Sequence, residues 1–309
     1  MLPTKPFFCR TTRQRALCGA ALLALLTACS TNSITGRKQF LLVSDEDTAK
    51  QSAAMYSSMM GDLGQKKQII TGAPVNARID AITNRLIQQA VLYRPKSVEW
   101  DWKVSVIDDP KTINAFCMPG GQMAIYTGLI DQLKATDDEI AQVMGHEIGH
   151  ALAGHGAEKM SLQMASGVAV LATTAVLANR GVDANASQLG LGAAAMAFVN
   201  LPNGRLTETE ADRIGIELAA RAGFKPEAAV NLWQKMGDAS GGGSRIDFLS
   251  THPSPDKRRE ALQNLGTAMA PLYANARAQN MTAFNWLHSD KAARPTVDPG
   301  HPLGLVPAK

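Results

Sequence analysis

The stretch TDDEIAQVMGHEIGH, which ends at His150, restricts the fold of this chain more than any other segment. Thr136 and Glu139 form a capping box, and the two aspartates between them favour the positive end of a helix dipole. A helix that begins there carries His146 and His150 on one face, because residues four apart are neighbours on a helix. The sequence therefore predicts one well-capped helix that presents two imidazoles side by side.

Those two histidines and Glu147 match H-E-x-x-H, in which both imidazoles bind zinc and the glutamate acts as a base. A hydrolytic zinc site has three protein ligands and one open position for water, whose pKa falls to about 7. His146 and His150 supply two of these ligands. Glu147 is expected to take the proton of the water and pass it to the departing amine.

The third ligand is expected from ETEAD, residues 208–212. Glu208 and Asp212 are four apart and share a helix face. This pairing suits one carboxylate on the metal and a second that accepts the N–H of a ligand imidazole. Glu210 is a rival ligand, although it lies off that face by about 200°. The alternative for all three acids is a solvated helix face.

Other histidines have roles that the pattern leaves open. His155 lies five residues after His150, one short of the metzincin spacing, which favours a helix-end or supporting role. His252 lies beside two prolines that stiffen its loop. We predict that His252 approaches the zinc, either as a donor to the developing oxyanion or as an occupant of the open position. The alternative is a histidine that anchors its loop. His288 and His301 are expected to be solvated.

The N-terminus predicts export and lipidation. Four basic residues precede an apolar run from Ala16 to Leu26, which is too short to span a bilayer stably. LTAC, ending at Cys29, resembles a lipobox, so residues 1–28 are expected to be a lipoprotein signal peptide and Cys29 the lipidated residue. Residues 29–44 would form the tether. An ordinary signal peptide that is cut elsewhere is the alternative.

Charge and cysteine content fit this prediction. Cleavage before Cys29 removes four of the 31 basic residues and leaves 27 against 27 acidic ones. Binding of nucleic acid by a basic surface then has no support from composition. Cys117 would be the one cysteine without a lipid or a place in the signal, so no disulfide framework is available. The core has to stabilise the fold.

The remaining pattern predicts a mainly helical α+β domain over residues 45–275, followed by a Pro-rich tail at 276–309 that is poorly ordered beyond Ala283. Helices are expected at 45–60, 76–92, 205–224 and 225–237, with a last helix after the STHPSP segment. Strands are expected at 100–108, 113–118 and 122–126, the last two joined by a Pro-Gly-Gly turn.

Two segments, Met160–Asn179 and Ala184–Gly204, contain no charged residue. We expect buried or lid helices near the site, because alanine and glycine contribute little transfer energy and the polar residues between the segments interrupt them. A membrane hairpin is the alternative.

Four blocks of sequence, NAFCMPGG, HEIGHALAGH, ETEADRIG and STHPSPDKR, together resemble the HtpX-type metallopeptidases, a family that includes the CAAX prenyl proteases. The lipobox and the following NSITGRKQF are similar to the periplasmic lipoprotein branch of that family, which contains LoiP and BepA. The resemblance implies a gluzincin-like zinc endopeptidase domain, with a small antiparallel sheet or hairpin before the H-E-x-x-H helix and one zinc ion per chain.

The family pattern implies that His146, His150 and Glu208 are zinc ligands. It also implies that Glu147 is the base and that Asp212 is a supporting carboxylate. The NAF block resembles an edge strand beside the substrate, which makes Asn114 and Ala115 candidate substrate-binding residues. An extended peptide can add to such an edge as a further strand. A plain hairpin is the alternative.

The expected function is therefore a zinc metalloendopeptidase that cleaves unfolded or misassembled envelope proteins. It would be anchored by lipid on the periplasmic face of the envelope, at the outer membrane. One alternative is a non-catalytic periplasmic chaperone or scaffold that binds extended chains, although such a protein has no need of a base like Glu147. The other is an integral membrane metallopeptidase.

Overall fold

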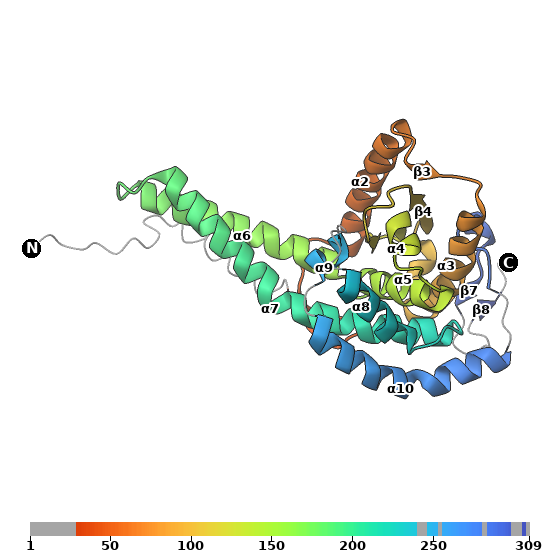
Figure 1. The fold of residues 1–309 in the computed structure, drawn as a ribbon. Coiled ribbons are helices and arrows are strands. Elements are labelled where there is room, and N and C mark those ends of the chain that lie inside the picture. Colours follow the sequence, from red (N-terminus) through yellow and green to blue (C-terminus); the bar gives the residue numbers. More distant parts are fainter. Residues whose placement is uncertain (1–28, 240–245, 253–254, 280–282, 298–304, 307–309) are drawn as a thin grey trace, which may run out of the picture.

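The computed structural model describes residues 29–239, 246–252, 255–279, 283–297 and 305–306. The expected signal peptide, residues 1–28, and His301 lie outside the described residues. The predicted α+β class is confirmed, because helices surround one small four-stranded sheet (Figure 1). The helices are α2 (Asp45–Gln65), α3 (Pro74–Tyr93), α4 (Thr127–Asp131), α5 (Asp137–Leu152), α6 (His155–Ala178), α7 (Ala184–Arg221), α8 (Ala228–Ala239), α9 (Asp247–Thr251) and α10 (Pro255–Gln279).

The four-stranded sheet has the order β3-β4-β6-β5. Its strands are β3 (Ile69–Ile70), β4 (Lys103–Ile107), β5 (Ala115–Cys117) and β6 (Gln122–Tyr126). The expected hairpin is confirmed, since β5 and β6 pair antiparallel. However, β4 and β6 run parallel, so the sheet as a whole is mixed. After β4 the chain crosses to the edge of the sheet, and β6 then returns between β4 and β5.

The turn between β5 and β6 depends on glycine. Gly120 and Gly121 have φ values of 93° and 91°, which L side chains rarely adopt. A Cβ atom on Gly121 would also lie 2.8 Å from the ring of Trp102, which is almost fully buried. The turn therefore packs directly on the core, and it fixes β5 as the edge strand nearest to α5.

The N-terminal residues form a second, smaller sheet. β1 (Cys29–Thr31) and β2 (Lys38–Phe40) pair antiparallel as a hairpin. Asn32 and Gln39 each donate a side-chain N–H to the carbonyl oxygen of Ala153, at 2.8 Å. The segment expected as a tether thus contains a hairpin that packs on the end of α5.

Much of the C-terminal tail is docked on the body. Trp286 is fully buried, and Arg294 donates to the carbonyl oxygens of Val98, Trp100 and Trp286. The expectation of poor order beyond Ala283 is therefore wrong for residues 284–297. The composition of the tail did not predict this docking, because one buried tryptophan supplies enough apolar area to hold a short polar segment in place.

The uncharged segments lie in α6 and α7, which run side by side as a long arm away from the body (Figure 1). Only 11% of the most apolar stretch of α6 is buried, and Val168 and Leu171 are 68% and 60% exposed. Of the expected buried or lid helices, the buried form is therefore wrong for α6. By length and composition, α6 could cross a membrane. An uncharged pattern alone does not distinguish a helix surrounded by protein from one that projects.

Candidate metal centre

The predicted helix of the H-E-x-x-H segment is confirmed as α5. Its capping box is present: the Thr136 hydroxyl accepts from the N–H of Glu139, and the Glu139 carboxylate accepts from the N–H of Thr136. The helix packs on α3, α7, α8 and β5 and is buried along almost its whole length. Both ends of the motif are therefore held rigidly, and the histidine face points toward α7.

Glycines let α5 and α7 approach closely. A Cβ atom on Gly149 would lie 2.9 Å from the carbonyl oxygen of Ala211, and one on Gly215 would lie 2.6 Å from the backbone of His146. No side chain fits in such gaps, because real Cβ contacts under 3.0 Å essentially do not occur. This close crossing brings the ETEAD segment of α7 against the two histidines.

Four side chains meet at this crossing: His146, His150, Glu208 and His252. Each offers one ligand atom, and the four atoms lie within 4.8 Å of one another. The Nε2 atoms of His146 and His150 are 3.1 Å apart, and Nε2 of His150 lies 3.3 Å from Oε1 of Glu208. Nδ1 of His252, at the end of α9, lies 3.4 Å from Nε2 of His146. Residues from three separate helices therefore converge on one point.

The outer nitrogen of His146 contacts Asp212, the residue for which the sequence predicted a supporting role. Nδ1 of His146 lies 2.9 Å from Oδ1 of Asp212. Arg258 donates from Nε and Nη2 to the same carboxylate at 2.8 and 2.5 Å. The sequence pattern assigned this arginine no role. Burial alone would raise the pKa of Asp212, but the bonds from His146 and Arg258 lower it. Arg258 lies in the STHPSPDKR block, the one sequence signal that pointed to it.

The electrostatics of the group favour a positive charge between its members. Burial opposes protonation of His146, but its contacts with Asp212 and Glu208 raise its pKa to about 9. Burial lowers the pKa of His150 to about 3. Contacts with three imidazoles hold the pKa of Glu208 far below its usual value, despite the opposite effect of burial. A neutral imidazole and an ionised carboxylate are the forms of these side chains that bind a divalent metal.

The side chain of Glu147 is buried beside this group. Its Oε1 atom has no hydrogen-bond partner among the described residues, although Nε2 of His252 lies 3.3 Å away. Burial raises the pKa of Glu147, and the neighbouring His252 and His146 only partly oppose this. A buried carboxylate oxygen without a partner is costly unless something binds to it. The residues present thus fit a metal with a proton acceptor next to it.

The rival acid and the extra histidine take other positions. Glu210 is outside the four-residue group and lies 2.9 Å from Nε2 of His155. His155 is the first residue of α6, and its Nδ1 atom lies 2.8 Å from Nδ1 of His150. This agrees with the expected helix-end or supporting position of His155. His288 is exposed, as expected, and pairs with Asp80.

The NAF segment lies at the edge of the sheet. Asn114 is half-buried, and its side-chain oxygen accepts from the N–H of Ala115 at 2.9 Å. Ala115 is 2% exposed, so only its main chain could meet another molecule. Cys117 on the same strand is a buried free thiol whose pKa is raised by burial and by the charge of Glu147. The edge strand therefore passes close to Glu147.

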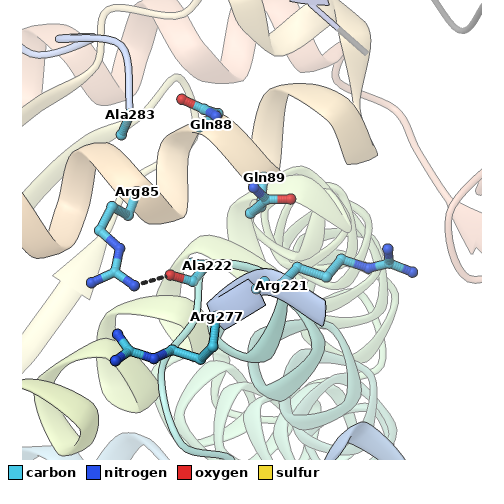
Figure 2. Close-up of a pocket in the computed structure, with 8 residues that line it drawn as sticks. Arg85, Gln88, Gln89, Arg221, Ala222, Arg277 and Ala283 are labelled. Atoms are coloured by element: carbon cyan, nitrogen blue, oxygen red, sulfur yellow. Dashed lines mark hydrogen bonds between the residues drawn. The ribbon is translucent and has the colours of Figure 1, made fainter. Parts of the chain in front are cut away.

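A cavity with a volume of about 230 Å³ lies elsewhere in the described part of the chain. Figure 2 shows that arginines from α3, α7 and α10 line it. Arg85 donates to the carbonyl oxygen of Ala222 at the end of α7 and lies 4.0 Å from the centre of the Phe224 ring. These contacts stabilise a helix end. None of the four converging residues lines this cavity.

Comparisons with known proteins agree with this geometry. Mitochondrial metalloendopeptidase OMA1 of Schizosaccharomyces pombe is 33% identical over 226 residues, which cover 73% of this chain and 63% of that protein. OMA1 of Arabidopsis thaliana is 37% identical over 161 residues, 52% of this chain and 31% of that protein. Metalloprotease LoiP of Escherichia coli is 40% identical over 68 residues, 22% of this chain and 25% of that protein.

This chain thus spans between about a quarter and two thirds of the length of these relatives. The sequence profile of peptidase family M48 matches residues 74–266, which include the whole four-residue group, Glu147, Asp212 and Arg258. The family predicted from the four sequence blocks is confirmed at this level, whereas the periplasmic lipoprotein branch stays a prediction. Because the matched region is more than half of the sequence and contains the complete site, the chain belongs to peptidase family M48.

Proposed function

We propose that this chain is a zinc-dependent endopeptidase that cleaves unfolded or misassembled proteins of the cell envelope. The observation that carries the proposal is the convergence of His146, His150 and Glu208 beside the buried carboxylate of Glu147. These three residues would hold the ion. Bound zinc would polarise the scissile carbonyl and lower the pKa of a water molecule to about 7.

Glu147 would act as the general base. Burial raises the pKa of Glu147, which makes the carboxylate a stronger base than an exposed glutamate. Oε1, which lies 3.3 Å from Nε2 of His252 in the resting state, would take a proton from the attacking water once that ring has moved away. The same oxygen can then deliver that proton to the nitrogen of the departing amine.

His252 would regulate access to the site. With His252 included, four protein ligands would surround the ion, and a hydrolytic site needs one position open. We infer that His252 occupies that position at rest and leaves it when a substrate binds. Because Phe248 anchors the five-residue helix α9 in the core, the movement would be that of the His252 side chain at the end of this helix. A donor to the oxyanion is the competing role for this ring.

The substrate would add to β5 as an extended strand. Two main-chain hydrogen bonds flank the β5–β6 ladder. The N–H of Tyr126 donates to the carbonyl oxygen of Asn114, and the N–H of Met118 donates to the carbonyl oxygen of Gln122. In an antiparallel pair such bonds alternate, so the main-chain groups of Ala115 and Cys117 point away from β6. The carbonyl oxygen of Ala115 and the main-chain groups of Cys117 are the expected partners of the peptide backbone, since the N–H of Ala115 already donates to the Asn114 side chain.

A non-catalytic chaperone that binds extended chains could use the same edge strand. The buried base argues against it, because binding alone does not require an acceptor beside a metal. The integral membrane alternative gains support from α6, whose length and apolar composition suffice for a span. We favour a lipid anchor at Cys29 on the periplasmic face of the outer membrane, which rests on the lipobox. A Cys29→Ala protein that still needs detergent for release would contradict the anchor and favour the span.

The test of the proposed activity is metal-dependent cleavage of an unfolded protein such as casein. We expect cleavage to stop after removal of zinc with a chelator and to return with about one equivalent of zinc per chain. Cleavage that persists in metal-free protein would exclude a metallopeptidase. Binding of casein without cleavage, by zinc-loaded protein, would favour the chaperone.

A further inference from the structure

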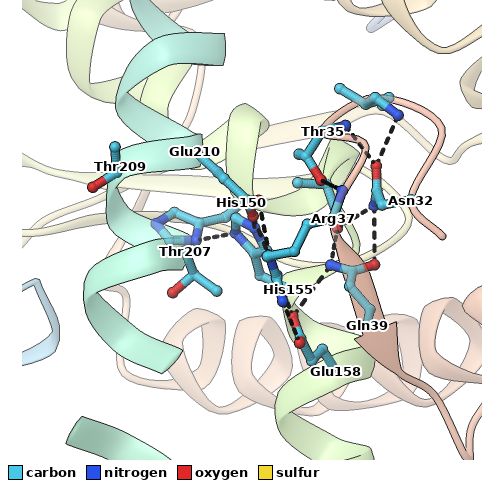
Figure 3. Close-up of polar contacts among 12 residues, drawn as sticks. Asn32, Thr35, Arg37, Gln39, His150, His155, Glu158, Thr207, Thr209 and Glu210 are labelled. Carbon is cyan, nitrogen blue, oxygen red and sulfur yellow. Dashed lines mark hydrogen bonds and ion pairs between the residues drawn. The ribbon is translucent and has the colours of Figure 1, made fainter. Parts of the chain in front are cut away.

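A continuous series of polar contacts connects the N-terminal hairpin to the histidine face of α5 (Figure 3). Nδ1 of His150 lies 2.8 Å from Nδ1 of His155. On the other side of that ring, Nε2 of His155 lies 2.9 Å from Oε2 of Glu210. Arg37, in the loop between β1 and β2, donates from Nε to Oε1 of Glu210 at 2.9 Å. Two side chains, Glu210 and His155, thus separate a residue of the hairpin from a proposed zinc ligand.

The contacts define which nitrogens carry protons. A carboxylate only accepts hydrogen bonds, so Nε2 of His155 is the donor to Glu210. In a neutral imidazole the other nitrogen is then an acceptor, and Nδ1 of His155 accepts from Nδ1–H of His150. This leaves the lone pair of His150 on Nε2, the atom that faces His146 and Glu208. The series therefore holds His150 in the tautomer that a metal needs.

Arg37 closes the series by joining two acids on different helices. Its guanidinium binds Glu158 of α6 through both Nη atoms at 2.6 Å, and Glu210 of α7 at 2.9 and 3.2 Å. Glu158 is buried and Glu210 is mostly buried, so without Arg37 two desolvated carboxylates would face each other. Bonds of this charged, bidentate kind are the strong ones in proteins. Arg37 therefore fixes the position of Glu210 and, through it, of His155.

The two histidines of the motif have equivalent supports. His146 contacts Asp212, which Arg258 holds with two bonds. His150 contacts His155, which contacts Glu210, and Arg37 holds Glu210. In both cases the support ends at a carboxylate held by a guanidinium, which contacts the outer ring nitrogen directly for His146 and through His155 for His150. Such supports orient a metal-binding ring and set its tautomer.

The hairpin has other attachments that do not involve Arg37. The hydroxyl of Ser161 on α6 accepts from the N–H groups of Leu42 and Val43 at 2.8 and 3.2 Å. Asn32 and Gln39 bind the carbonyl oxygen of Ala153. Replacement of Arg37 should therefore remove the support of Glu210 while the hairpin stays docked.

We propose that Arg37, Glu210 and His155 are positioning residues for His150, so that the N-terminal hairpin is part of the metal site. This inference rests on the proposed function, because it assigns His150 to a metal. It adds residues that lie in part outside the matched family region, which begins at residue 74. A fragment that starts after the hairpin is expected to bind zinc poorly even if it folds.

The experiment compares the zinc affinity of variants by competition with a chromophoric chelator. Arg37→Met, His155→Phe and Glu210→Leu are expected to weaken zinc binding by about 10- to 100-fold. Lys38→Met is the matched control: it removes the same charge from the same hairpin, and Lys38 is exposed and outside the series. Glu210→Gln is expected to lose less than Glu210→Leu, because its amide oxygen still accepts from His155. Circular dichroism of each zinc-free variant checks the fold.

A second readout does not depend on affinity. In cobalt-substituted protein, the Nδ1 proton of His150 should exchange slowly with solvent and give a paramagnetically shifted proton signal. Arg37→Met should broaden or remove this signal, whereas Lys38→Met should keep it. His155→Phe leaves the ion pair of Arg37 with Glu210 intact, so this variant keeps the test decisive if Arg37→Met or Glu210→Leu does not fold.

The outcomes separate this inference from the function on which it rests. If wild type binds zinc and cleaves casein but Arg37→Met and His155→Phe bind zinc as tightly as Lys38→Met, the positioning role is wrong and the peptidase stands. If wild type binds no zinc, both are wrong. Weaker binding in the series variants, with Lys38→Met unchanged, supports the inference.

Discussion

Nδ1 of His252 lies 2.9 Å from both carboxylate oxygens of Glu208, the acid predicted to bind the metal. Nε2 of the same ring lies 3.3 Å from Glu147, the predicted base. One imidazole thus contacts a proposed ligand and the proposed catalytic group together. The ring is also stacked on Phe248, which holds it in this place. A substrate carbonyl would need the space that this ring fills.

Replacement of His252 by Ala is therefore predicted to raise the rate of casein cleavage several-fold in zinc-saturated protein, because the open position is no longer blocked. Zinc affinity should fall by about tenfold with the loss of one nitrogen near the ion. The measurement is initial rate and zinc affinity on the same preparations. A fall in rate at saturating zinc would contradict the blocking role and favour an oxyanion donor.

Removal of the Asp212 carboxylate is predicted to destabilise the fold as well as the site. Asp212→Ala leaves Arg258 buried with its charge less well compensated, and breaking a buried pair in this way costs about 3 to 5 kcal/mol. Urea unfolding of the zinc-free protein measures this. The control is Glu227→Ala, which removes an exposed acid immediately before α8. It should change the free energy of unfolding by less than about 0.5 kcal/mol. Equal stability of the two variants would contradict the assigned role of Asp212.

The Cys117 thiol is predicted to be unreactive in the folded protein. Burial and the charge of Glu147 raise its pKa well above 9.0, so the reactive thiolate is scarce at pH 8. In a protein that begins at Ser30, Cys117 is the single cysteine. Alkylation at pH 8 should be far slower than in urea-unfolded protein. Comparable rates would show that β5 is not packed as described.

The sequence predicted the parts of the site that depend on local spacing. His146 and His150 share a face because they are four apart on a capped helix, and Glu208 and Asp212 do so for the same reason. The meeting of the two faces was a hypothesis from ligand chemistry. In the structure it depends on Gly149 and Gly215, whose role is visible only when both helices are placed.

Other features of the fold and the site could not be predicted from the sequence, for physical reasons. The contacts from Arg37 to Glu210 and from Arg258 to Asp212 join residues that are 173 and 46 positions apart, and no periodicity encodes such pairs. The parallel pairing of β4 with β6 depends on a crossover that short strands do not reveal. The burial of Trp286 shows the same limit, because a single side chain in a polar tail has no pattern.

The central claim is that Glu147 performs the proton transfer at a zinc ion held by its neighbours. Its most direct test is the variant Glu147→Gln, measured for zinc content and casein cleavage together. The prediction is one zinc per chain, as in wild type, with cleavage reduced by at least about 100-fold, the lower range for loss of a general base. Cleavage at the wild-type rate by zinc-loaded Glu147→Gln protein would contradict the account.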